Sequence, residues 1–153
     1  MDKIIRVLVV DDSALMREVI CDVLAGLPDI VVVGVARDGH EALVKVEDLQ
    51  PDIVTLDLHM PGMDGLATLD AILAQQPLPV IMVSSLTQRA AEITLQALER
   101  GALDYVPKPE NLQANDGPFR VELLHKLRTM AGADVEQMLR IRRLRAERAA
   151  ARG

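Results

Sequence analysis

The chain has 153 residues, half of them apolar, which is enough to bury the core of one domain. It has no run of eighteen apolar residues and no basic leader with a cleavage site, so we expect a soluble, unexported, cytoplasmic protein without a membrane partner. The lone cysteine, Cys21, excludes an internal disulfide, and its apolar neighbours indicate that it packs in the core.

The net charge of −6 is distributed unevenly. The last 20 residues carry six arginines and three acidic residues, a net charge of +3, so residues 1–133 carry −9. Two aromatic residues, Tyr105 and Phe119, are too few to stack on single-stranded nucleic acid. Because the basic tail also lacks interfacial aromatic anchors and no helix-turn-helix pattern follows the body, an interdomain linker fits it better than a nucleic-acid or membrane contact.

Short apolar runs alternate with longer segments of helical periodicity along the chain. Continuous runs rich in valine and isoleucine predict buried strands at 5–10, 30–35, 53–56, 80–83 and 103–106. Helical periodicity predicts helices at 14–24, 40–46, 66–74, 90–100 and 118–130. Ser13 is expected to cap the first helix, Asp64 or Gly65 to open the third, and Gly101 to end the fourth.

This alternation predicts an α/β fold with an open, doubly wound parallel sheet and right-handed crossovers. A break is expected in the turn-rich segment 110–117, before the last helix of the body. We assign residues 1–131 to one domain. Residues 132–153 are assigned to a basic helix or interdomain linker that leads out of it.

Polar side chains follow all the predicted strands, although the second delivers only Arg37 and Asp38. In a doubly wound sheet the carboxyl ends of the strands meet at one edge, where ligands bind. The polar residues at those ends are Asp11, Asp12, Asp57, Ser84, Ser85 and Lys108. A single aspartate after a strand most often serves a turn, but several polar groups at matching strand ends favour a site.

Three carboxylates at one edge repel one another and call for a cation. Magnesium prefers oxygen ligands and uses one or two carboxylates together with water and phosphate. A carboxylate held beside that ion can attack a phosphoryl group, while a lysine and a hydroxyl neutralise the phosphoryl oxygens. Lys108 and Ser84 suit the last two roles.

Four segments of the chain resemble the receiver domains of bacterial two-component response regulators. They are VDDSALMR at 10–17, DLHMPGMDGL at 57–66, IMVSSLT at 81–87 and DYVPKP at 104–109. They occur in the family's order and spacing, over residues 4 to about 130. The resemblance implies a flavodoxin-like, (βα)5 receiver fold with strand order 2-1-3-4-5.

The resemblance also implies a role for each residue of the site. Asp57 would accept a phosphoryl group from a sensor histidine kinase, Lys108 would bind that group, and Ser84 and Tyr105 would be the switch hydroxyl and the switch aromatic. The implied magnesium ligands are Asp11, Asp12, Asp57 and the backbone carbonyl of His59. Phosphorylation would repack the face formed by helix 90–100, strand 103–106 and helix 118–130, where an effector domain, a partner protein or a second copy would bind.

Within the family, the segment PVIMVSSLT at 79–87 resembles the receivers of chemotaxis protein-glutamate methylesterases. Those proteins carry a second, catalytic domain that their unphosphorylated receiver would inhibit. Nothing after Gly117 can encode it, so we expect either a piece of such an enzyme or a stand-alone receiver that acts through protein contacts. A magnesium-dependent phosphatase with an aspartate nucleophile is the alternative enzyme, but it needs an acid where His59 stands, and a DNA-binding regulator would lack its effector domain.

Overall fold

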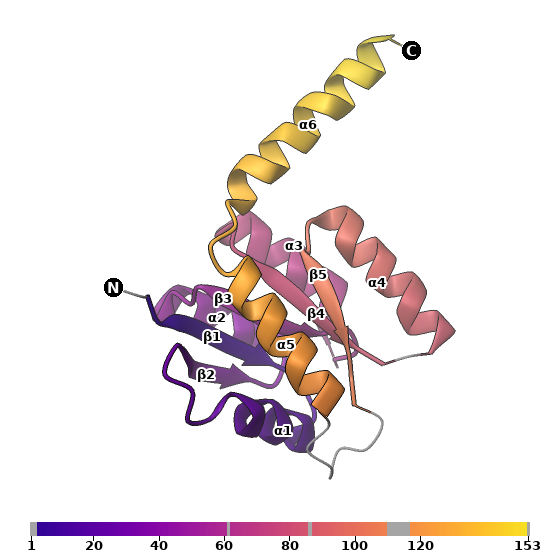
Figure 1. The fold of residues 1–153 in the computed structure, drawn as a ribbon. Helices are drawn as coiled ribbons and strands as arrows, with labels where there is room; N and C mark the ends of the chain where they lie inside the picture. Colours follow the sequence, from indigo (N-terminus) through magenta and orange to yellow (C-terminus); the bar gives the residue numbers. More distant parts are fainter. Residues whose placement is uncertain (1–2, 61, 86, 110–116, 153) are drawn as a thin grey trace.

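Five parallel strands form one sheet in a computed structural model that describes residues 3–60, 62–85, 87–109 and 117–152 (Figure 1). The strands are β1 (Ile5–Val10), β2 (Ile30–Ala36), β3 (Ile53–Asp57), β4 (Val80–Ser84) and β5 (Asp104–Pro107). Their order in the sheet is β2-β1-β3-β4-β5, which confirms the predicted topology. The change of direction next to β1 opens the crevice beyond the carboxyl ends of β1 and β3.

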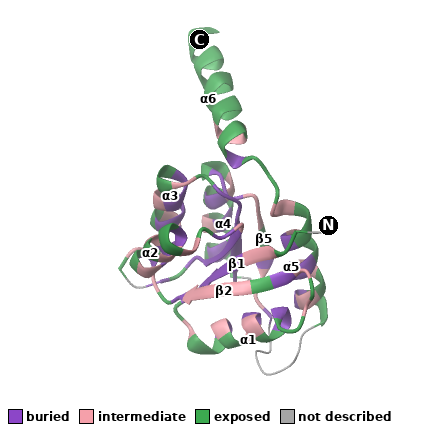
Figure 2. Ribbon diagram, turned by 90° about the vertical axis from the view of Figure 1, so that its left-hand side faces the viewer, coloured by how far each residue is buried: buried purple, intermediate pink, exposed green. Residues whose placement is uncertain are grey.

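Helices cover both faces of this sheet. They are α1 (Ala14–Leu24), α2 (Gly39–Leu49), α3 (Gly65–Gln75), α4 (Gln88–Arg100), α5 (Gly117–Met130) and α6 (Val135–Arg152). One apolar cluster joins the sheet to α2, α3 and α4, and the other joins it to α1 and α5. Because both faces are covered, the strands are apolar at consecutive positions, and the central strands are purple in Figure 2.

Side-chain caps set the beginnings of the helices. The Ser13 hydroxyl accepts a hydrogen bond from the Met16 amide at 3.1 Å, as predicted. Asp64 is the residue that caps α3, since its carboxylate accepts from the Ala67 amide at 2.8 Å. Gly101 ends α4 with a φ of 127°, which suits a residue without a side chain.

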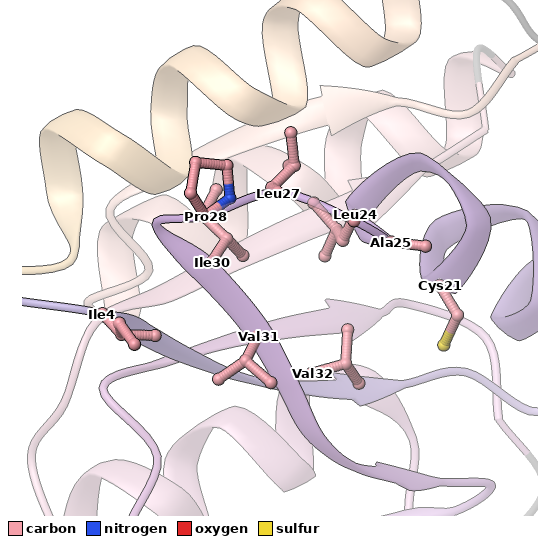
Figure 3. Close-up of a pocket in the computed structure, with 10 residues that line it drawn as sticks. Ile4, Cys21, Leu24, Ala25, Leu27, Pro28, Ile30, Val31 and Val32 are labelled. Atoms are coloured by element: carbon pink, nitrogen blue, oxygen red, sulfur yellow. The ribbon is translucent and has the colours of Figure 1, made fainter.

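The core position predicted for Cys21 is wrong. The buried stripe of α1 consists of Met16, Ile20, Val23 and Leu24. Cys21 lies at the margin of this stripe, where it is only partly buried and lines an apolar surface pocket of about 350 Å³ beside β2 (Figure 3). One step along a helix turns a side chain by about 100°, which is enough to move it from the core to the surface.

The basic tail forms α6, as predicted, and projects away from the sheet (Figure 1). Val135 is buried, Met138 and Leu139 pack partly against the core beside α3 and α4, and the helix is exposed from Arg140 onward. Within the described residues, none of the helices combines the length and the apolar character needed to cross a membrane. The predicted break at 110–117 lies outside the described residues, except that Gly117 begins α5.

Gly65 allows the start of α3 to pack directly on the end of β3. A Cβ atom at this position would lie 2.5 Å from the carbonyl oxygen of Asp57 and 2.6 Å from the Cα atom of Leu58. Because backbone atoms cannot rotate away, we expect Gly65→Ala to lower the free energy of unfolding by about 1–3 kcal/mol. Urea denaturation would measure this change. The control is Gly132→Ala, whose Cβ would meet no atom within 4 Å, and equal stability of the two variants would contradict the prediction.

Candidate functional site

The register of the parallel strands brings the predicted site residues to one edge of the sheet. Val10 pairs with Leu56, so Asp11 lies one step further along, beside Asp57. The remaining pairs are Asp57 with Val83 and Ser84 with Pro107. Lys108 comes directly after β5, and its amide donates to the Ser84 carbonyl at 2.7 Å.

Three carboxylates meet in this crevice. Asp11 and Asp57 have exposed fractions of 0% and 2%, whereas Asp12 is exposed. One oxygen from each lies within 4.8 Å of the others. The Asp11 Oδ1 atom accepts a hydrogen bond from the Ser13 amide at 2.9 Å, which leaves its Oδ2 atom free to face the crevice.

Lys108 supplies the positive charge of the site. Its Nζ atom lies 2.9 Å from Asp57 Oδ1 and 3.5 Å from Asp11 Oδ2. Both carboxylate oxygens are buried, and among the described residues Lys108 is the cation that pairs with each of them. One ammonium group is therefore shared between two buried carboxylates.

This shortage of positive charge shifts the pKa values of the site. Burial, followed by the nearby charge of Asp11, raises the pKa of Asp57 to about 7, and Lys108 only partly opposes these effects. Burial likewise raises the pKa of Asp11. Burial lowers the pKa of Lys108, but the two carboxylates outweigh it and hold that pKa above its usual value. The site is thus electrostatically incomplete without a further cation.

A hard divalent cation fits this donor set, because the open groups are carboxylate oxygens and magnesium binds such oxygens while keeping positions for water and phosphate. Asp11, Asp12 and Asp57 could hold such an ion. His59 follows Asp57 by two residues with its side chain exposed, and a ligand role for its backbone carbonyl stays a prediction.

The two predicted switch residues flank a cavity beside this crevice. Ser84 is buried at the end of β4, whereas the Tyr105 side chain on β5 has an exposed fraction of 41%. Between them lies a cavity of about 240 Å³. Its lining residues are Ser84, Ser85, Ala91, Thr94, Leu95 and Tyr105.

Sequence reasoning gave no role to two cations that contact these residues. Arg17 donates to the Asp11 carbonyl at 2.8 Å and so braces the end of β1. Lys126 of α5 lies over the Tyr105 ring. Arg17 is the last residue of the VDDSALMR segment, which is the signal that could have identified it, while Lys126 lies in a helix that none of the quoted segments reaches.

Residues 7–115 match the response regulator receiver domain family, and the chain belongs to that family. A receiver domain of this kind is a phosphorylation-dependent signalling switch. The chain is 52% identical over 130 residues to a protein-glutamate methylesterase/protein-glutamine glutaminase of Symbiobacterium thermophilum, which covers 84% of this chain and 36% of that protein. It thus resembles a methylesterase receiver in particular, and it spans little more than a third of the length of the curated relatives it matches.

Solved structures agree with this assignment. The response regulator domain of CheB from Thermotoga maritima is 45% identical, with a TM-score of 0.77, over 86% of this chain and 99% of that chain. A structure of the P1 domain of CheA3 in complex with CheY6 from R. sphaeroides matches with 32% identity and a TM-score of 0.70, over 86% of this chain and 99% of that chain.

We expect Asp57→Asn to stabilise the metal-free protein more at pH 8 than at pH 5. The pKa of Asp57 is about 7 in the folded state and ordinarily 3.8, so the folded state retains a proton that the unfolded state has lost between these values. The free energy of unfolding of the wild type therefore falls as the pH rises through this window. The variant, which carries no charge there, should gain roughly 1–3 kcal/mol more at pH 8 than at pH 5.

Urea denaturation with a chelator at the two pH values would measure this difference. Asp48→Asn, at an exposed position of α2, is the control and should change stability little at either pH. An equal effect of Asp57→Asn at both pH values would show that the folded state does not raise the pKa of Asp57.

Proposed function

We propose that Asp57 accepts a phosphoryl group at a magnesium site formed by Asp11, Asp12, Asp57 and the backbone carbonyl of His59. The observation that carries this proposal is the cluster of three carboxylates within 4.8 Å with a single lysine 2.9 Å from Asp57. When bound, the ion would neutralise negative charge on the carboxylates and on the incoming phosphoryl oxygens. Lys108 would contribute the second positive charge.

The transfer is a displacement at phosphorus. An oxygen of the Asp57 carboxylate forms a bond to phosphorus, and the bond from phosphorus to the leaving atom of the donor breaks. We propose a sensor histidine kinase as donor, so the leaving atom is an imidazole nitrogen, which takes the electron pair and is then protonated. The complex of the related CheY6 with the P1 domain of CheA3 supports a kinase of the chemotaxis type.

Ser84 and Tyr105 would couple this event to the surface. The Ser84 hydroxyl would turn toward the phosphoryl oxygens, and the Tyr105 ring would move inward toward the cavity of about 240 Å³ that both residues line. The exposed apolar side chains of Leu95 on α4 and Val121 on α5 belong to the face that would change. An effector domain, a partner protein or a second copy of the chain would bind there.

The effector that fits this receiver best is a protein-glutamate methylesterase/glutamine deamidase domain beyond α6. Residues 1–131 would then be the receiver and residues 132–153 the linker helix. Two observations support this architecture: the exposed α6 helix leads away from the body, and the relatives are more than twice as long as this chain. The unphosphorylated receiver would inhibit the enzyme by covering it, and phosphorylation would release it.

Incubation with acetyl phosphate and magnesium should add one phosphoryl group to each chain, at Asp57. The carboxylates alone repel the anionic donor, so we expect little modification when magnesium is removed with a chelator. Intact-protein mass spectrometry would measure the added mass, and peptide mapping would locate it. Asp57→Asn is the control, and modification that persists unchanged in this variant would refute the assignment of the acceptor.

Ser84→Ala should still accept phosphate at Asp57 but should fail to pass the change to Tyr105. In the proposed function the Ser84 hydroxyl turns from the cavity toward the phosphoryl oxygens, and the alanine variant lacks this hydroxyl. Tyrosine fluorescence or NMR with and without beryllofluoride would follow the ring, since Tyr105 is the only tyrosine and the chain has no tryptophan. Thr55→Ser, which keeps a buried hydroxyl on the neighbouring strand β3, is the matched control. A wild-type response in Ser84→Ala would disprove the coupling.

A further inference from the structure

A lysine on α5 lies over the exposed ring of Tyr105. The Lys126 Nζ atom lies 5.2 Å from the centroid of the ring, within the range of a cation–π contact. The same ammonium donates to the Tyr105 carbonyl oxygen at 2.6 Å. Lys126 therefore contacts both the backbone and the ring of the proposed switch residue.

The position of this ammonium is set by groups other than the ring. Lys126 forms ion pairs with Glu122, one turn earlier in α5, at 2.7 Å and with Asp104 of β5 at 3.3 Å. Its side chain has an exposed fraction of only 15%. Burial lowers the pKa of Lys126, but Glu122 and Asp104 outweigh it and keep that pKa above its usual value, so the group stays charged. Fixed between two carboxylates and a carbonyl, the ammonium has no freedom to follow the ring.

We propose that Lys126 is a latch that favours the outward position of Tyr105 and thereby weakens the phosphorylated arrangement of the receiver. This inference rests on the proposed function, in which Tyr105 moves inward when Asp57 is phosphorylated. An inward ring would leave the ammonium, while the hydrogen bond to the Tyr105 carbonyl and both ion pairs would remain. The contact between the ammonium and the ring is thus the interaction that differs between the two ring positions. Only an interaction whose free energy differs between the two positions can shift the equilibrium between them.

Lys126 is a positioning residue, because it acts through Tyr105 and makes no described contact with the carboxylates of the crevice. A cation–π contact at a partly exposed site corresponds to a shift of about 2- to 5-fold in the ratio of the two ring positions. Since the apparent affinity of a ligand scales with the population of the competent state, the latch should weaken binding of a phosphoryl analogue by the same factor.

The test compares the affinity for beryllofluoride with magnesium in the wild type, Lys126→Met and Lys126→Arg. Calorimetry would measure the affinity and the fluorescence of Tyr105 would follow the ring. We expect Lys126→Met to bind about 2- to 5-fold more tightly. Lys126→Arg should stay near the wild type, because a guanidinium keeps a cation over the ring. Thermal melts would establish that each variant is folded.

Two controls separate the latch from a general effect of charge. Arg128→Met removes the same charge from α5, but Arg128 pairs with Asp29 at 2.7 Å and not with Tyr105. The affinity of this variant for beryllofluoride should therefore not rise. In a Tyr105→Leu background, Lys126→Met should leave the affinity unchanged, since no ring remains to be held.

Several outcomes would overturn the latch. They are equal or weaker binding by Lys126→Met, equal tightening by Arg128→Met, and tightening that persists without the Tyr105 ring. If the wild type binds beryllofluoride with no response of Tyr105, both the latch and the proposed coupling of Ser84 to Tyr105 are wrong. If the wild type responds and Lys126→Met does not tighten, the latch alone is wrong.

Discussion

Two buried carboxylates share one ammonium at the carboxyl edge of the sheet, and the rest of the molecule depends on this arrangement. Asp11 and Asp57 lie where water cannot screen them, and Lys108 reaches both but neutralises only one charge. Burial against this deficit raises the pKa of Asp57 to about 7. The same deficit lowers the stability of the metal-free site and would favour binding of a divalent cation. In the proposed function, the charge of that cation would then let the site accept a phosphoryl group.

The crevice is held by close backbone packing, while the neighbouring face keeps room for movement. Gly65 brings α3 against the carbonyl of Asp57, and the Lys108 amide ties β5 to the Ser84 carbonyl. By contrast, Ser84 borders a cavity of about 240 Å³ whose other side is the exposed ring of Tyr105. Rigid support beneath Asp57, the proposed acceptor, and free volume beside it suit a two-state switch, because a densely packed core would not allow an alternative arrangement.

Charge and exposure distinguish the body from α6. The acidic body carries the site, whereas α6 is basic, almost entirely exposed beyond its first turns, and joined to the core through Val135 and Leu139. The Arg142 side chain also donates to the Leu98 carbonyl near the end of α4 at 3.2 Å. This helix therefore begins against an element of the face that we propose to change on phosphorylation. That placement suits a connection to an effector domain.

The sequence alone determined the β-α alternation and the five strands, because hydrophobic periodicity and local caps are properties of short segments. It also placed polar residues at one edge of the sheet, because parallel strands share one direction. These residues are Asp11, Asp12, Asp57, Ser84 and Lys108. Only the tertiary structure decided where the buried stripe of α1 ends and how the side chains of α5 meet those of β5. Cys21 was expected in the core, yet it lies at the edge of the buried stripe of α1, since helical periodicity does not determine where a stripe ends. The contact of Lys126 with Tyr105 could not be inferred from spacing, because it depends on how α5 packs across β5 and on the carboxylates that fix the ammonium.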